Sequence, residues 1–342
     1  MLDDLKLIHE KDAQDALGIA AKQWQQLENT LTVVQPVEFQ DINNIVFSGM
    51  GGSALYGLMF ASWPGVDIPY EVSRNYDIPR YVGGNTLFIA SSYSGNTEET
   101  LSALAKAEEN GAQIAVIAGG GKLLDIAQAK KYPYVILPKV SQPRFAALSG
   151  LNALVLLLSF LVGNEKTTEL ASGASFLKLA SASWVVDVPT VDNLAKKLAY
   201  DVVGSSPVIY AGPLLFPAAY KWKISFNENA KNIAWCNQYP EFNHNEFLGW
   251  TSHPVDKPYK VIDLKSSFDH PQVKKRFEVT DRLLSGRRPA AIAVEAQGVT
   301  VFEQLVWTVT LGDFVSLYTA ILNGQNPTPV DIIEKFKQEI SK

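Results

Sequence analysis

The sequence is poor in cysteine, since Cys236 is the only cysteine among its 342 residues. A single thiol cannot build a disulfide framework within the chain or a metal site made of several cysteines. Such a composition is typical of proteins that work in a reducing compartment and are stabilised by their apolar core. We therefore expect a cytoplasmic protein.

The chain also lacks a strong charge of one sign and a long apolar run. Its 30 Lys and Arg residues against 35 Asp and Glu give a net charge of −5, which does not favour a nucleic-acid partner. The apolar run ALVLLLSFLV at 153–162 is too short to span a bilayer, so we expect a buried helix there and no membrane partner. The charged start, MLDDLKLIHEKD, has no apolar core of a signal peptide.

Short apolar strands alternate with helical patterns along the chain. This alternation is typical of parallel sheets covered by helices on both faces, so the predicted fold class is α/β. The predicted strands are 45–48, 68–75, 86–92, 113–119 and 134–138, and then 206–213, 259–266 and 290–296.

The pattern occurs twice, which predicts a duplicated architecture. A long helix at about 144–162 leads into the polar stretch GNEKTTEL, which we interpret as a break between domains. We therefore predict domains at 1–155 and 156–342, with a long buried helix near 302–324 in the second.

The first candidate site is GMGGSA at 49–54, which follows a predicted strand and opens a helix. Glycines let a backbone approach an anion closely, and free N–H groups point outward at a helix start. The spacing also fits a dinucleotide-binding turn with Glu71 about 20 residues on. However, Glu71 lies inside its strand, whereas a ribose-binding acid should end it. A tight turn without a ligand is the third interpretation.

The second candidate site is SSYSGNTEE at 91–99, where hydroxyl side chains crowd the end of a strand. Ser92, Ser94 and Thr97 can each donate a hydrogen bond, and Gly95 and Asn96 tolerate a sharp turn. A helix cap needs one hydroxyl and not three, so we favour a binding role over simple capping. Without Lys or Arg, the loop would hold an anion through neutral donors and the helix dipole, which suits a phosphomonoester.

Together, GMGGSA and SYSGNTEE resemble the sugar-isomerase (SIS) domain, whose hydroxyl loop binds the phosphate of a sugar phosphate. The stretches FNENAKN (226–232), PEFNHNEFLGW (240–250), SQPRFAALSG and NPTPVDIIEKFK extend the resemblance to the bifunctional phosphoglucose/phosphomannose isomerases of bacteria and archaea. The resemblance implies two SIS-type domains, each a flavodoxin-like three-layer sandwich, in a homodimer. The phosphate would then be bound by Gly51, Gly52, Ser53, Ser92, Ser94 and Thr97.

The chemistry of aldose–ketose isomerisation suggests roles for three further residues. A single carboxylate, for which Glu228 is the candidate, can move a proton between C1 and C2 through a cis-enediol. Arg144 could stabilise the charge that develops on the enediolate oxygen. His244 could open the sugar ring near neutral pH, and the resemblance implies that it reaches the site of the neighbouring subunit. We expect no metal or redox cofactor.

The resemblance also implies a lysine near the C-terminus. Ile332, Ile333, Phe336 and Ile340 predict the buried face of an amphipathic helix, and Lys337 borders that face. Lys335 lies on the predicted wet side, where a surface ion pair is the simpler interpretation. We therefore favour Lys337.

The sequence leaves three alternatives open. One is a sugar-phosphate sensor without catalysis, although no basic helix-turn-helix pattern precedes the first domain. Another is a nicotinamide-dependent oxidoreductase, which would leave the hydroxyl loop unexplained. The third is an enzyme of amino-sugar phosphates, which would change only the substrate.

Overall fold

The computed structural model describes residues 1–63, 65–251 and 258–340. The chain forms two compact units, each built around one sheet. The first-sheet unit comprises Lys22–Lys178 and Thr300–Glu303, and the second-sheet unit comprises Met1–Ala21, Leu179–Val299 and Gln304–Lys342. The division at residues 155 and 156 stays a prediction about the domains, because the compact units group the chain in a more interleaved way.

The first-sheet unit alternates strands and helices as expected from the sequence. Its strands are β1 (Val33–Val34), β2 (Asn44–Ser48), β3 (Tyr70–Ser73), β4 (Thr86–Ser92), β5 (Gln113–Ala118) and β6 (Tyr134–Ile136). Its helices are α3 (Gln25–Glu28), α4 (Gly51–Ser62), α5 (Glu98–Glu109), α6 (Gly121–Lys130), η1 (Pro143–Ala146), α7 (Ala147–Leu157) and most of α8 (Ser159–Ser181).

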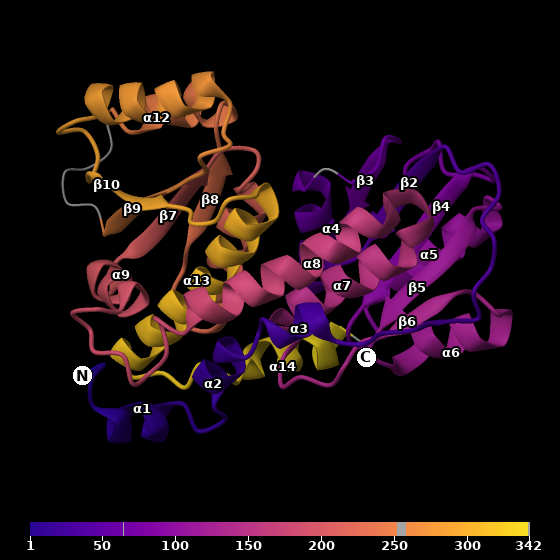
Figure 1. Ribbon diagram of the computed structural model, residues 1–342, viewed down its shortest axis with the longest axis horizontal. Coiled ribbons are helices and arrows are strands. Elements are labelled where there is room, and N and C mark those ends of the chain that lie inside the picture. The colour runs from indigo at the N-terminus through magenta and orange to yellow at the C-terminus, as the bar shows by residue number, and fades with distance from the viewer. Residues whose placement is uncertain (64, 252–257, 341–342) are drawn as a thin grey trace. The chain divides into compact units, whose positions relative to one another are not determined.

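The strand order in this sheet is β1-β6-β5-β4-β2-β3, and only the short edge strand β1 runs antiparallel to its neighbour. Apart from β1 this is the flavodoxin-like order, in which the chain reverses direction across the sheet between β2 and β4. Side chains of β2, β4 and β5 pack with those of α5 and α6 on one face. Figure 1 shows α4 and α7 on the other face.

The second-sheet unit repeats this plan with fewer strands. Its strands are β7 (Ser206–Ala211), β8 (Trp235–Gln238), β9 (Tyr259–Lys265) and β10 (Ala291–Glu295). Its helices are α1 (Leu5–Lys11), α2 (Ala16–Ala21), α9 (Leu194–Val202), α10 (Phe216–Glu228), η2 (Glu241–His244), α11 (Glu246–Gly249), α12 (Pro271–Leu283), most of α13 (Val301–Leu322) and α14 (Asp331–Ile340).

The strands of the second sheet are all parallel, in the order β10-β9-β7-β8. This order matches β5-β4-β2-β3 of the first sheet, and the reversal falls between β7 and β9. Val273 and Phe277 of α12 pack on β7 and β9, and Figure 1 shows α9 and α13 on the opposite face. The predicted α/β class, with parallel sheets covered by helices, is confirmed.

Some local predictions differ from the structure. The single helix expected at about 144–162 is divided into η1, α7 and the start of α8. The expected polar break at 163–170 is helical except at Gly163, whose φ of 66° kinks α8. Polar residues there form the exposed side of a helix, so their composition alone resembled a loop.

Helix α13 is long and apolar enough to cross a membrane by length and composition. However, 94% of its apolar window is buried inside the protein, which is what a core helix shows.

Candidate functional site

The two candidate loops lie side by side at the carboxyl ends of two neighbouring strands in the first sheet. GMGGSA follows β2 and SSYSGNTEE follows β4, and these two strands are hydrogen-bonded neighbours. In open α/β sheets, ligands bind beyond the carboxyl ends of the strands at the point where the strand order reverses. The topology therefore brings both candidate loops to the position that this fold uses for ligands.

The glycine turn opens directly into α4. Gly51 has a φ of +50°, a conformation that favours glycine, and the N-cap residue Met50 contributes no side-chain hydrogen bond to the helix. A Cβ on Gly52 would lie 3.3 Å from Cα of Arg144, so the absence of a side chain lets η1 pack against the turn. The turn therefore combines a helix N-terminus with a close neighbouring arginine.

Three of the predicted hydroxyls converge in the loop after β4. The Oγ of Ser92 lies 2.7 Å from Oγ1 of Thr97 and 3.4 Å from Oγ of Ser94. Thr97 is the N-cap residue of α5, but its side chain makes no capping hydrogen bond. The same oxygens also accept from the loop backbone, Ser92 Oγ from Gly95 N at 3.0 Å and Ser94 Oγ from Asn96 N at 3.3 Å. Because a hydroxyl oxygen can accept a hydrogen bond while its hydrogen is donated, an anion could receive hydrogen bonds from this group.

Ser53, the fifth residue of the GMGGSA turn, is hydrogen-bonded to the hydroxyl loop. Its Oγ accepts a hydrogen bond from the backbone N–H of Tyr93 at 3.0 Å. The hydroxyl of Tyr93 in turn accepts from the N–H of Val140 at 2.6 Å. Tyr93 therefore connects both loops to the segment that leads into Arg144, a role that the sequence pattern did not indicate.

The triglycine turn, Gly119 to Gly121, packs against the backbone of the hydroxyl loop. A Cβ on Gly95 would lie 1.6 Å from the carbonyl oxygen of Gly120, and one on Gly121 would lie 2.4 Å from that of Ser94. Leu123 N donates to Gly95 O at 2.9 Å, and Lys122 N donates to Asn96 Oδ1 at 3.1 Å. No role was predicted for this turn from the sequence, although three successive glycines indicate close backbone contact.

Arg144, in η1, is 2% exposed, and its guanidinium lies 4.8 Å from the ring centre of Phe145. Its packing against Gly52 fixes its backbone beside the glycine turn. A buried, fixed guanidinium is well suited to stabilise negative charge, because it needs little reorganisation.

Glu228 is the last residue of α10 in the second-sheet unit, and it is half-buried. The chain turns sharply just after it, since Lys231 has a φ of +51°. The Nζ of Lys231 donates to the carbonyl of Glu228 at 3.0 Å and to that of Asn326 at 2.7 Å. The end of α10 is thereby attached to the segment that leads to α14.

His244 ends η2 and is exposed, while residues near it are anchored. Glu246 accepts hydrogen bonds from the hydroxyl of Tyr210 and from Nδ2 of Asn237, the latter at 2.7 Å. On the other side, Asn243 donates to Thr280 at 3.0 Å. The loop is therefore fixed to the sheet and to α12 while the imidazole is presented to solvent.

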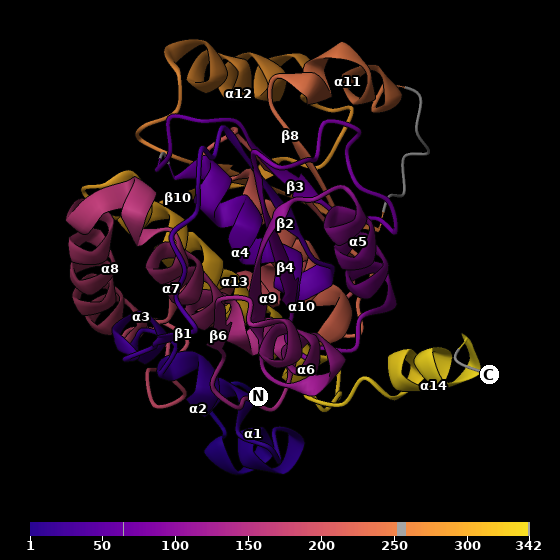
Figure 2. The same ribbon diagram turned by 90° about the vertical axis from the view of Figure 1, so that its right-hand side faces the viewer.

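The prediction that one face of the C-terminal helix is buried is wrong for this structure. None of the residues of α14 is buried, and Ile332 and Phe336 are 81% and 63% exposed. Figure 2 shows the helix at the end of an extended yellow segment. Amphipathicity indicated a helix correctly, but a periodic pattern cannot say what covers its apolar side. The Nζ of Lys337 forms an exposed ion pair with Glu334 at 2.8 Å.

The structure groups the predicted residues by unit. The glycine turn, the three hydroxyls and Arg144 belong to the first-sheet unit, whereas Glu228, His244 and Lys337 belong to the second-sheet unit. Among the described residues, no group of three or more His, Cys, Asp or Glu side chains could hold a metal ion.

Two family models match this chain. The SIS domain matches residues 38–162, and the C-terminal SIS domain of bacterial phospho-glucose isomerase matches residues 191–340. The fold and the loops at the strand ends thus define a protein made of SIS domains.

Curated relatives specify the family further. A bifunctional phosphoglucose/phosphomannose isomerase of Caldicellulosiruptor bescii is 33% identical over 311 residues, which are 90% of this chain and 92% of that protein. The chain belongs to the family of bifunctional phosphoglucose/phosphomannose isomerases.

Two other matches widen the comparison. A D-glucosamine-6-phosphate 4-epimerase of Sulfolobus acidocaldarius is 36% identical over 231 residues, 64% of this chain and 70% of that protein. The crystal structure of a glucose-6-phosphate isomerase-like protein from Thermus thermophilus has a similar fold. Its TM-score is 0.67 at 18% identity, with 97% of this chain and 99% of that chain covered.

Proposed function

We propose that this isomerase interconverts glucose 6-phosphate and fructose 6-phosphate, and that it accepts mannose 6-phosphate as a second aldose. The family supports this proposal, and one structural observation carries it: the hydroxyls of Ser92, Ser94 and Thr97 converge beside an open glycine turn at the reversal point of the sheet. Neutral donors and a helix N-terminus suit a phosphate dianion that must bind and leave in every turnover.

The phosphate of the sugar would be bound by two sets of donors. The backbone N–H groups of Gly51 and Gly52 would act together with the hydroxyl of Ser53, whose oxygen already accepts a hydrogen bond and whose hydrogen can be donated. The hydroxyls of Ser92, Ser94 and Thr97 would complete the site.

The proton transfer would be carried by Glu228. Its carboxylate would take the proton from C2 of the open-chain aldose, and the electron pair of that bond would form the C1–C2 double bond while the C1 oxygen takes the negative charge of a cis-enediolate. The proton of the C2 hydroxyl would then pass to the C1 oxygen, which gives the C1 hydroxyl, and the same carboxyl would return its proton to C1 as the C2 oxygen becomes the ketone. The guanidinium of Arg144 would stabilise negative charge on the enediolate oxygens during both steps.

Ring opening requires a separate acid–base group, and His244 is our candidate. Its exposed position on an anchored loop is compatible with action in the site of a second subunit, so we include a homodimer in the proposal. Lys337 would assist from the C-terminal helix. We expect the enzyme to act in the cytoplasm, in glycolysis and gluconeogenesis, without a metal or redox cofactor.

A coupled assay of the purified protein with fructose 6-phosphate tests this function. Glucose 6-phosphate and mannose 6-phosphate are measured separately, and EDTA is present in one arm. We expect both aldoses to form, and we expect the rate of formation of each to be the same with EDTA as without it. Binding of fructose 6-phosphate without formation of either product would instead support a sugar-phosphate sensor.

The base assignment has its own test. Glu228→Gln keeps the shape of the side chain but removes the proton acceptor, so we expect kcat to fall by about a hundredfold or more. The KM for fructose 6-phosphate should change little, because the phosphate donors remain. Turnover close to that of the wild type would refute the assignment of Glu228 as the base.

A second candidate function is the conversion of an amino-sugar phosphate. The observation that favours it is the 36% identity with a D-glucosamine-6-phosphate 4-epimerase. The same assay with glucosamine 6-phosphate as substrate, analysed for an epimer and for a ketose, decides between the two. We expect slower turnover of the amino sugar than of fructose 6-phosphate.

A further inference from the structure

A row of buried polar residues joins α10 to α13 within the second-sheet unit. Lys221 and Ser225 lie four residues apart on α10, and Asn229, the C-cap residue of this helix, follows four residues later; each is 0% exposed. Residues four apart lie on one face of a helix, so the three form a polar stripe. Their partners on α13 are Asp313 and Ser316, which are 1% and 0% exposed.

The hydrogen bonds in this row are short and connected. The Nζ of Lys221 lies 2.5 Å from Oδ1 of Asp313, and the Oγ of Ser225 donates to the same oxygen at 2.7 Å. Asn229 Nδ2 donates to Ser316 Oγ at 2.9 Å, and Ser316 Oγ donates to the carbonyl of Asp313 at 2.8 Å. The row therefore links three successive turns of α10 to one stretch of α13.

The row ends at Asn229, which directly follows Glu228 in the chain. Asn323, just beyond α13, donates to the carbonyl of Ala230 at 3.2 Å, and Lys231 donates to the carbonyl of Glu228 at 3.0 Å. The backbone that bears the Glu228 carboxylate is thus held on both sides.

A buried ion pair contributes little net stability, because the loss of hydration offsets most of the attraction, but it can specify the register of two packed helices. A slip of α10 by one residue would move Glu228 by about 1.5 Å along the axis and about 100° around it. Displacement of a catalytic group by about 1 Å can lower the rate about a hundredfold. Trp222 of α10 also packs against Gly312 of α13, where a Cβ would lie 2.2 Å from the indole. This apolar contact holds the two helices close together, but it does not fix their register as an ion pair can.

We propose that the cluster of Lys221, Ser225 and Asp313 is a positioning device that fixes the rotation and height of α10 on α13 and so aims the carboxylate of Glu228. This inference rests on the proposed function, because it takes Glu228 as the base. The cluster itself does not touch the substrate.

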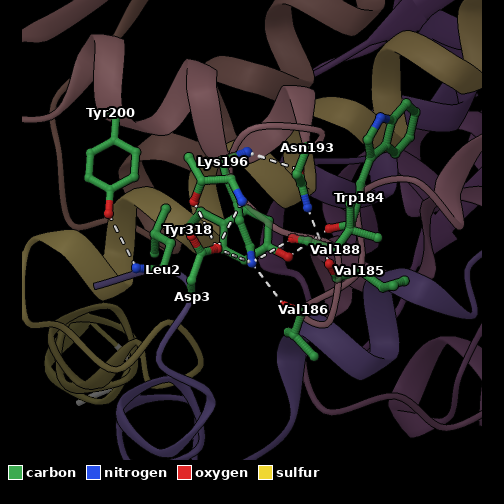
Figure 3. Close-up of polar contacts among 11 residues, drawn as sticks. Leu2, Asp3, Trp184, Val185, Val186, Val188, Asn193, Lys196, Tyr200 and Tyr318 are labelled. Carbon is green, nitrogen blue, oxygen red and sulfur yellow. Dashed lines mark hydrogen bonds and ion pairs between the residues drawn. The ribbon is translucent and has the colours of Figure 1, made fainter.

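A second buried lysine in the same unit provides a matched control. Lys196 of α9 is also 0% exposed, and Figure 3 shows its contacts. Its Nζ donates to the carbonyls of Val186 and Val188 at 2.8 Å each and pairs with Asp3 at 3.1 Å. These contacts fasten the N-terminus to a loop, and none of the three involves α10.

The test replaces the ion pair by apolar residues. In Lys221→Met/Asp313→Leu we expect kcat for fructose 6-phosphate to fall about tenfold or more, with KM within threefold and a melting temperature equal to or above that of the wild type. In Lys196→Met we expect the opposite pattern, a lower melting temperature with kcat per folded molecule within about twofold, because a buried contact is lost away from Glu228.

A purely structural cluster would leave kcat per folded molecule unchanged in the double variant, and that result would overturn the inference. If the double variant does not fold, Lys221→Met/Asp313→Asn keeps the size of both side chains and is judged by the same split between kcat and KM. An inactive wild type would overturn the proposed function and this inference together. An active wild type with an unaffected double variant would overturn the inference alone.

Discussion

The two sheets have the same strand order around their reversal points, but the loops at these points differ in chemistry. In the first sheet, Gly49 follows β2, and Ser91 and Ser92 end the neighbouring strand β4. In the second sheet, Gly212 follows β7, and Ser266 and Ser267 follow the neighbouring strand β9. Only the first pair of loops has hydroxyls that converge on one another among the described residues. A shared topology therefore supplies two equivalent places, and the side chains decide which of them can hold an anion.

The second place is closed by its own side chains. Ser266 Oγ donates to Oε1 of Gln304 at 2.7 Å, and Gln304 Nε2 donates to Ser267 Oγ at 2.7 Å. A Cβ on Gly212 would lie 2.2 Å from Oδ1 of Asp269, so a carboxyl group occupies the space beside the glycine turn. Burial raises the pKa of Asp269, because desolvation disfavours its charged form. The space beside the Gly212 turn is therefore already occupied by a carboxyl group.

The largest effect should follow from breaking the support of the first loop. In Gly95→Ala the new Cβ would lie 1.6 Å from the carbonyl oxygen of Gly120, so the backbone of one loop must move. We expect the KM for fructose 6-phosphate to rise by about a hundredfold, because the hydroxyls no longer converge. Steady-state kinetics over a wide range of substrate concentration measures this change.

Gly204→Ala is the matched control in the second-sheet unit. The φ of Gly204, +77°, is similar to the +69° of Gly95, but a Cβ on Gly204 would meet no atom within 4 Å. We expect a loss of stability of about 1 kcal/mol from the backbone conformation alone, with an unchanged KM. Equal kinetic effects of the two substitutions would contradict the idea that the triglycine turn shapes the loop.

Alanine substitutions in the serine-containing loops after β4 and after β9 should have different effects on KM, and the larger of these is expected to be intermediate in size. Ser94→Ala/Thr97→Ala removes two donors of the proposed phosphate site, and we expect the KM for fructose 6-phosphate to rise by about 10- to 100-fold. Ser266→Ala/Ser267→Ala removes partners of the buried Gln304, so we expect a loss of about 1–3 kcal/mol of stability while KM stays within about twofold. Kinetics and thermal melts of both variants check this, and a raised KM in the second variant would point to a role for the second loop.

The sequence predicted the parts of this arrangement that depend on local pattern. The strand at 86–92 has the predicted bounds, because an apolar run is encoded over a few consecutive residues. The roles of the triglycine turn and of Tyr93 were not predicted, because they depend on contacts between separate segments. Tyr93, for example, bonds to Pro138 and Val140, more than 40 residues away.

The polar row on α10 shows a second limit of sequence reasoning. Lys221, Ser225 and Asn229 form a helical stripe that would ordinarily indicate a solvated face, yet all three are buried. Their partners lie on α13, about 90 residues further along the chain, in a helix whose composition is largely apolar. Conversely, the apolar stripe of α14 predicted burial but is exposed.

The last comparison between the two sheets concerns a buried acid of the second sheet, at a position where the first sheet has an apolar residue. Asp263 of β9 pairs in register with Tyr210 of β7, whereas the corresponding residue of β4, next to Phe47 of β2, is Ile89. Among the described residues, neither carboxylate oxygen of Asp263 makes a hydrogen bond, and the guanidinium of Arg288 is 4.0 Å away. Burial raises the pKa of Asp263 from 3.8 to about 7, and Arg288 only partly opposes this shift.

The sign of the pH dependence follows from this raised pKa. Because the folded state holds the proton more tightly than the unfolded state, the contribution of Asp263 to stability is fully present below about pH 4 and is lost as the pH rises through 7. Asp263→Asn cannot titrate, so between pH 5 and pH 8 its stability relative to that of the wild type should rise by roughly 2–3 kcal/mol. Asp263→Leu, which restores the apolar character found in β4, should show the same trend. Thermal melts at the two pH values measure the difference, and parallel shifts of wild type and both variants would show that this carboxyl group does not titrate in that range.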